Sequence, residues 1–141
     1  MAAVDQPPRR LHTSMSVEQS PADLTVSLPL DADAPRAARH HVALVDHPSP
    51  DLRDVVVLLT SELISQAVNR CPTSGVSFEL CAWMPPDLVR VEIRLPETFL
   101  DLGWEEYEHD LGTIVIRTAA DRLWVGSEGN LARMWFEIDR H

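Results

Sequence analysis

The chain has 141 residues, of which 45% are hydrophobic, and a formal net charge of −10 at pH 7. This length suits one domain with a core of its own, and no apolar run approaches the roughly 20 residues that span a bilayer. The acidic balance and the absence of Lys argue against nucleic acid as a partner, which needs clustered positive charge, and against any site that depends on a lysine.

Residues 1–21 mix Pro, Gln, Ser and Arg without hydrophobic periodicity, which predicts a disordered N-terminal arm. No apolar run follows Arg9 and Arg10, so neither a signal peptide nor a membrane anchor is expected. We therefore expect a cytoplasmic protein whose folded domain occupies residues 22–141.

A strand and a helix are predicted at the start of this domain. Over residues 23–30 apolar and polar residues alternate, as in a half-buried strand, and Pro29 is expected at its end or on a sheet edge. Asp33 as N-cap and Pro35 in the first turn then predict a helix that runs to about His47.

The longest helical pattern begins at Pro50, with Ser49 as its N-cap, and extends to about Arg70. Its polar residues Glu62, Gln66 and Arg70 recur every four positions, so a helix places them in one stripe. Its buried face is expected to carry the apolar residues that recur at helical spacing: Leu52, Val55, Val56, Leu59, Leu63 and Ala67.

Two strand patterns flank Pro85-Pro86-Asp87 and predict a hairpin. One face of this hairpin is apolar and comprises Val76, Phe78, Leu80, Ala82, Val89, Val91, Ile93 and Leu95. On the second strand the opposite face carries Arg90, Glu92 and Arg94. The next segment, residues 96–110, is acidic and aperiodic, and we expect a long loop in which Trp104 is exposed for recognition.

The rest of the chain is expected to form a helix over residues 111–122 and two strands, 123–126 and 131–139, joined by the turn-like tetrapeptide 127–130. The inward residues of that helix are predicted to be Ile114, Val115, Thr118 and Ala119. Strands gathered into hairpins, with helices between them, predict an α+β fold: a two-layer sandwich of a mostly antiparallel sheet with helices on one face.

The cysteines and histidines of the sequence do not indicate a catalytic or metal-binding site. Cys71 and Cys81 are too few for a disulfide framework and lack zinc spacing, so both are expected to be core thiols. His40, His41 and His47 have no carboxylate at ligand spacing, which argues against a metal site, and His40 and His41 are expected to border an interaction surface. No Ser or Cys lies in a nucleophile elbow, so nothing supports acyl transfer.

The element order and two motifs carry a resemblance to a known family. Residues 61–71 read SELISQAVNRC, and residues 118–126 read TAADRLWVG. These segments resemble the SELVTNAVRHA helix and the DALADRWGV passage of the anti-sigma-factor serine kinases, a small branch of the Bergerat-type (histidine-kinase-like) ATPases. The resemblance covers about residues 22–139 and implies the histidine-kinase-like fold.

The resemblance also implies roles for residues of the long helix. Glu62 matches the family's general base for phosphoryl transfer, and Gln66 matches the Asn that ligates Mg²⁺ between the phosphates of ATP. Asn69 and Arg70 follow at the implied nucleotide site. Gln66 is one methylene longer than Asn, and Mg²⁺ tolerates displaced ligands poorly. Arg70 could contact a phosphate of the nucleotide; the alternative is an ion pair with Glu62 or with neighbours of Gln66 on the same face of the helix.

The other nucleotide motifs of the family are degraded here. Its Asp-x-Gly-x-Gly, which reads adenine, aligns with LPETF, where Leu95 replaces the Asp and Glu97 and Phe99 replace the glycines. Leu offers no acceptor to the adenine amino group, and a site that depends on that hydrogen bond loses discrimination. Of the Gly-rich lid only Gly112 remains, followed by Thr113, and the acidic residues before them would repel a triphosphate.

These features lead to one expected function and three alternatives. We expect a regulatory protein that resembles anti-sigma factors and acts by protein–protein contact, with weak or absent binding of ATP and Mg²⁺. Its partners would be a sigma factor, an anti-anti-sigma domain or a second copy of the chain. The alternatives are an active serine/threonine kinase of an anti-anti-sigma partner, a signalling scaffold without a sigma factor, and a remodelled apolar pocket for another small ligand.

Overall fold

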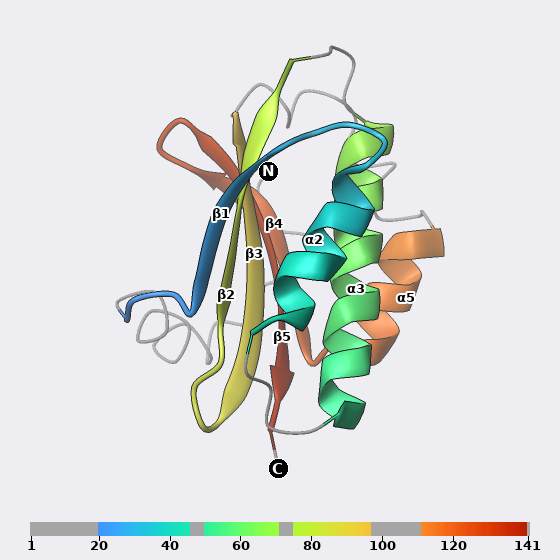
Figure 1. The fold of residues 1–141 in the computed structure, drawn as a ribbon, viewed down its shortest axis with the longest axis vertical. Helices are drawn as coiled ribbons and strands as arrows, with labels where there is room; N and C mark the ends of the chain where they lie inside the picture. Colours follow the sequence, from blue (N-terminus) through green and yellow to red (C-terminus); the bar gives the residue numbers. More distant parts are fainter. Residues whose placement is uncertain (1–19, 46–49, 71–74, 97–110, 141) are drawn as a thin grey trace.

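The computed structural model describes residues 20–45, 50–70, 75–96 and 111–140 (Figure 1). In chain order its elements are β1 (Leu24–Pro29), α2 (Ala34–Ala43), α3 (Pro50–Asn69), β2 (Ser77–Trp83), β3 (Leu88–Pro96), α5 (Leu111–Ala119), β4 (Arg122–Glu128) and β5 (Leu131–Asp139). None of the described helices is long and apolar enough to cross a membrane. Most of the predicted arm and of the loop after β3 lies outside these residues; only Ser20 and Pro21 of the arm and Pro96 of the loop are described. Three residues named in the sequence analysis also lie outside them: Ser49, Cys71 and Trp104.

The strands form one five-stranded antiparallel sheet in the order β1-β2-β3-β5-β4. The three helices that the structure describes lie on one side of this sheet, with α3 between α2 and α5 (Figure 1). The predicted α+β class, with a helical layer on one face of an antiparallel sheet, is therefore confirmed. Strands β1 and β4 are the two edges, and Pro29 is the last residue of β1, as expected.

The main core lies between the sheet and the helices. Alternation along β3 directs Val91, Ile93 and Leu95 toward the helical layer, where they are fully buried. From α3, Leu59 and Leu63 meet them in the same cluster. A buried Leu or Ile side chain contributes about 1.5–3 kcal/mol. The apolar faces predicted for β2, β3 and β5 are confirmed, because their residues belong to the core cluster between the sheet and the helices.

Two helix boundaries and one cap differ from the sequence prediction. Helix α2 ends at Ala43 instead of near His47, and α5 ends at Ala119 because Arg122 already begins β4. Asp33 occupies the N-cap position of α2, but its side chain makes no capping hydrogen bond. Instead, the Asp33 backbone N–H donates to the carboxylate of Asp31 at 2.9 Å. A local Asx-type turn therefore precedes this helix.

The inward face of α5 was predicted only in part: Val115 packs against the core as expected, but Ile114, Thr118 and Ala119 do not. Ile116 is its fully buried residue, whereas Ile114 is 48% exposed and Thr118 and Ala119 are exposed. Three consecutive apolar residues give a short helix no clear period, so its docking against α3 selects the buried face. On α3 itself, Val55 is 36% exposed although it was expected inward.

The β4–β5 hairpin is tighter than predicted. Ser127 and Glu128 extend β4, and the turn is reduced to Gly129 and Asn130. Gly129 has φ of 63°, a left-handed conformation that costs glycine little and suits a two-residue hairpin.

Candidate functional site

The residues that the resemblance assigns to catalysis lie on the flank of α3 that faces α5. On the opposite flank, Ser61 accepts a hydrogen bond from Arg39 of α2 at 2.9 Å. Each residue turns a helix by about 100°, so Glu62 points away from α2, and Gln66 lies one turn further along the same flank. Glu62 is half-buried and Gln66 is 9% exposed. The structure thus brings Glu62 and Gln66 together beside α5.

The end of this stripe is less regular. Asn69 is the last residue of α3 and is exposed, and Arg70 follows it, half-buried. The backbone N–H of Arg70 donates to the Ala67 carbonyl at 3.3 Å, which closes the final turn.

The position expected to read adenine belongs to the core. Leu95 is 1% exposed, pairs with Ala132 of β5 and belongs to the main hydrophobic cluster. Neither side chain has a polar group that could hold a base. Gly112 and Thr113 lie in the first turn of α5, and their surroundings are outside the described part, as are Glu97 and Phe99. Among the described residues no group of three or more His, Cys, Asp or Glu could hold a metal.

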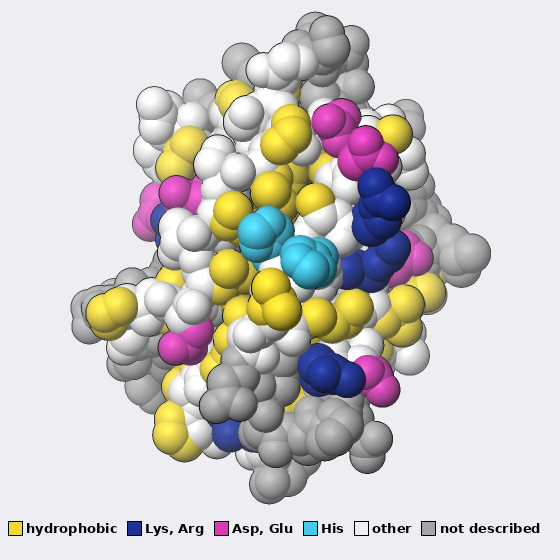
Figure 2. Space-filling model, in the orientation of Figure 1, with side chains coloured by type: hydrophobic (Ala, Val, Ile, Leu, Met, Phe, Trp, Pro, Cys, Tyr) yellow, Lys and Arg dark blue, Asp and Glu magenta, His cyan; other side chains and the backbone are white. Residues whose placement is uncertain are grey.

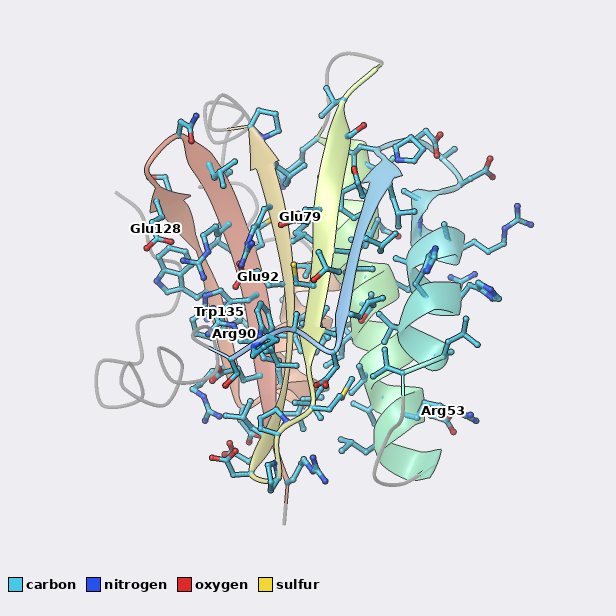
Figure 3. The ribbon with its side chains drawn as sticks, turned by 60° about the vertical axis from the view of Figure 1, so that its left-hand side comes forward. Arg53, Glu79, Arg90, Glu92, Glu128 and Trp135 are labelled. Carbon is cyan, nitrogen blue, oxygen red and sulfur yellow. The ribbon has the colours of Figure 1, made fainter. Side chains whose placement is uncertain are left out.

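The face of the sheet opposite the helices carries a buried charged cluster that the sequence did not reveal. Figure 3 shows Arg90, Glu92 and Trp135 on this face, while Arg53 lies on the helical layer. Arg90, Glu92 and Glu137 have 0% exposure, although residues 90, 92 and 94 were predicted only as the face opposite the apolar one. Three tryptophans on the same face are the signal that could have revealed this burial: Trp83, Trp124 and Trp135.

Glu92 is the centre of this cluster. Its carboxylate accepts hydrogen bonds from three arginines on two strands: Arg90 at 2.7 Å, Arg94 at 2.6 Å and Arg133 at 2.9 and 3.1 Å. Burial by itself would raise the pKa of Glu92, but the Arg133 hydrogen bond and the charges of Arg90 and Arg133 lower it to about 2. Glu92 is therefore ionised across the physiological range.

Arg90 links the charges to the aromatic side chains. Its guanidinium carbon lies 4.2 Å from the ring centre of Trp135 and 5.6 Å from that of Trp83. Such cation–π contacts are worth about 2 kcal/mol when desolvated. Arg90 also pairs with Glu137 at 3.4 Å, which in turn accepts from Arg122 at 2.6 Å. These ion pairs link β3, β4 and β5 on the face of the sheet opposite the helices.

Cys81 lies on the same face and is buried, as expected for a core thiol. Burial raises the pKa of its thiol to about 11, a shift that the charge of Arg94 opposes. Nucleophilic chemistry needs a thiolate, which is scarce at neutral pH with this pKa. Cys81 is therefore a structural residue.

The pH dependence of stability follows from Glu92. Its folded pKa lies below the ordinary value of 4.5, so its contribution is complete above pH 4.5 and is lost as pH falls toward 2. Urea unfolding followed by tryptophan fluorescence should show a loss of about 3 kcal/mol from this group over that window. The stability difference between the wild type and Glu92→Gln should shrink in parallel, because Glu92 protonated by acid is uncharged, as Gln is at every pH. A difference that stays constant down to pH 2 would contradict the assignment.

Comparisons with known proteins do not identify a family for this chain. No family model matches the chain, and no curated protein matches it. The candidate site therefore rests on the residues of α3, on Leu95 and on the order of the elements.

Proposed function

We propose that this chain is a regulatory protein-binding domain of the anti-sigma type in which the nucleotide site has been given up. The order strand, helix, helix, strand, strand, helix, strand, strand supports the family resemblance drawn from residues 61–71 and 118–126. The expected partners are a sigma factor or an anti-anti-sigma domain. Protein contact, and not phosphoryl transfer, is the activity.

One observation carries this proposal: Leu95 is 1% exposed within the main core. In the family pattern this position presents a carboxylate to adenine. Here the side chain has no acceptor and faces other apolar side chains, so a purine would find neither a hydrogen bond nor an opening. Leu95 of β3 is paired with Ala132 of β5, so the apolar face continues to the end of β3. This pairing also supports the loss of the adenine-binding position.

Gln66 supports the proposal from the other side of the implied site. Mg²⁺ in nucleotide sites keeps several waters and takes only one or two protein oxygens. Gln66 is 9% exposed, which leaves its amide little room for a hydrated ion. Glu62 would then have no metal–nucleotide complex to act on.

Calorimetry with Mg-ATP tests the proposal. No binding tighter than a Kd of about 100 µM is expected, where the free energy would reach only about −5.5 kcal/mol. Thermal unfolding gives an independent readout, because 1 mM ligand at that Kd would stabilise the fold by about 1.4 kcal/mol. Gln66→Ala is the matched control, since Gln66 is the implied Mg²⁺ ligand and any genuine signal from Mg-ATP should weaken with it. A saturable signal that Gln66→Ala weakens would overturn the loss of the nucleotide site.

The second candidate is an active serine/threonine kinase of an anti-anti-sigma partner. It is favoured by the shared flank of Glu62 and Gln66, which preserves the four-residue spacing of a base and a metal ligand beside α5. Transfer of labelled phosphate from ATP to such a partner, lost in Glu62→Ala, would establish it. If neither nucleotide binding nor phosphate transfer is detected, the binding-domain proposal is supported over the kinase.

The partner itself is tested by affinity capture from cells that encode this chain, with a sigma subunit as the expected prey. Capture is followed by mixing the two purified proteins and measuring co-elution on size exclusion. Co-elution at micromolar concentration supports the proposal. Failure of every sigma subunit of that cell to co-elute would contradict the anti-sigma role and favour the signalling scaffold.

A further inference from the structure

The far face of the sheet, which carries Trp83, Arg90, Trp135 and their neighbours opposite the helices, is buried more deeply than the described elements explain. The three described helices pack on the other side, and an antiparallel sheet with helices on one side usually leaves its second face in water. Here Trp83 and Trp135 are 4% exposed and Leu88 is 1% exposed. Tryptophan is large and rarely covered completely at a surface, so this burial requires a further layer over the far face.

The burial of the far face is uneven along the strands. At the end where β3 begins, Arg90 and Glu137 are 0% exposed and Arg122 is 6% exposed. Toward the end where β3 finishes, the side chains of Arg94 and Glu128 are 30% and 70% exposed. The covering layer therefore lies over the first half of β3 and the segments of β4 and β5 beside it.

Burial of this depth does not extend over the helical side of the domain. Figure 2 shows the two described histidines of α2, His40 and His41, at the surface among hydrophobic side chains. Leu44 is 71% exposed and Leu58 of α3 is 55% exposed. The covering layer is therefore a local feature of the far face.

The described chain begins on the far face, at its buried end. The indole N–H of Trp83 donates to the Ser20 carbonyl at 3.0 Å, and a buried Trp N–H usually has such a partner. Trp83 also forms a small apolar cluster with Cys81 and Leu88, and Ala22 packs against it. The chain that precedes Ser20 thus starts from the half of this face that is covered.

The segment 97–110 is less well placed to form the layer. It follows Pro96, at the end of β3 where the far face is exposed. It leads into Leu111 of α5, on the helical side of the sheet. Helix α5 finishes next to Arg122, at the buried end, so Leu111 lies toward the exposed end. Both ends of this segment therefore lie away from the buried half of the far face.

The chain before Ser20 has the length and the composition that the layer needs. Three strand spacings separate β2 from β4, about 14 Å in all, and about five extended residues span that distance. The run 11–17 (LHTSMSV) contains no acidic residue and no arginine, and it carries Leu11, Met15 and Val17. Methionine makes favourable contacts with aromatic rings, so this run suits a face of tryptophans.

We propose that residues 11–19 lie across the far face of β2, β3 and β5 and form the layer that buries the tryptophans and the charged cluster. Leu11, Met15 and Val17 supply the apolar contacts, and the hydrogen bond between Trp83 and Ser20 anchors the segment. For these residues the proposal replaces the expectation of a disordered arm. It goes beyond the proposed function and does not depend on it.

Alkylation of Cys81 by iodoacetamide tests the proposal, because this thiol lies on the far face and is 1% exposed. The rate is measured on the full chain by mass spectrometry of the peptide that contains Cys81. Three variants, each with three added aspartates, are compared with the wild type. The apolar variant combines Leu11→Asp, Met15→Asp and Val17→Asp. The polar variant is its matched control and combines Thr13→Asp, Ser14→Asp and Ser16→Asp. The loop variant combines Phe99→Asp, Leu100→Asp and Leu102→Asp.

The apolar variant is expected to be alkylated at Cys81 at least tenfold faster than the wild type. The polar and loop variants are expected to stay within twofold of the wild type. Equal rates in the apolar and polar variants overturn the proposal. An increase in the loop variant that equals or exceeds that of the apolar variant overturns it in favour of the segment 97–110.

Hydrogen exchange of the unmodified chain is the second measurement, in case the apolar variant does not fold. The backbone amides of residues 11–19 are expected to exchange at least tenfold more slowly than in an isolated peptide of the same sequence, because a packed segment is protected. Exchange at the rate of the peptide overturns the proposal. Neither measurement involves ATP or a sigma factor, so failure of this inference is distinct from failure of the proposed function.

Discussion

Replacement of Glu92 by Gln is expected to lower the free energy of unfolding by about 3–5 kcal/mol, the usual cost of leaving a buried charge uncompensated. The carboxylate is fully buried and accepts hydrogen bonds from Arg90, Arg94 and Arg133. In the variant, three guanidinium groups remain with one negative charge fewer. The Gln amide nitrogen adds a donor where only acceptors are useful. Urea unfolding monitored by tryptophan fluorescence measures this loss.

Glu79→Gln is the matched control for this variant. Glu79 contacts Arg94 at 3.0 Å, on the same sheet face, but its side chain is 43% exposed. Solvent screens this pair, so its removal should cost no more than about 1 kcal/mol. Equal losses in the two variants would show that burial of the cluster does not determine its contribution.

Leu95→Asp is expected to be the most damaging single change at the implied nucleotide site. It restores the residue type of the family motif at a position that is 1% exposed among apolar neighbours. A buried carboxylate without a partner should cost about 4 kcal/mol or more, a large share of the 5–15 kcal/mol that holds a domain together. The variant should therefore unfold at lower urea or fail to fold, and should not gain ATP binding.

Leu95→Met separates polarity from shape at this position. It keeps the volume and the apolar character and should cost less than about 1.5 kcal/mol. If Leu95→Asp instead folds with near wild-type stability and binds Mg-ATP by calorimetry, the position opens onto a nucleotide pocket. That result would support the kinase alternative and contradict the proposed loss of the site.

The sequence predicted the side of the sheet that faces the helices because apolar residues alternate along the strands. Along β3, apolar residues at every second position identify one buried face, and the same rule holds for β5. Leu95 was correctly placed on that face by alternation alone. Proline and a capping residue also located the start of α2. These features are local, so a single sequence encodes them.

The helix α5 shows where local patterns fail. Its run Ile114-Val115-Ile116 has no clear period, so the predicted inward face included the exposed Ile114 and missed the buried Ile116. Helix α3 shows the same limit at Val55. Contact with a neighbouring helix decides which of several apolar residues is covered.

What the sequence determined by itself is the α+β class, the element order and the apolar faces of the central strands, because these depend on neighbours along the chain. Only the tertiary structure decided that Arg90 and Glu92 are buried, since their partners Arg133 and Glu137 come from β5, more than forty positions away in the chain. It also decided that Glu62 and Gln66 face α5 and that β1 is an edge strand of the described sheet. Those properties depend on which elements pack together, and no local pattern contains that information.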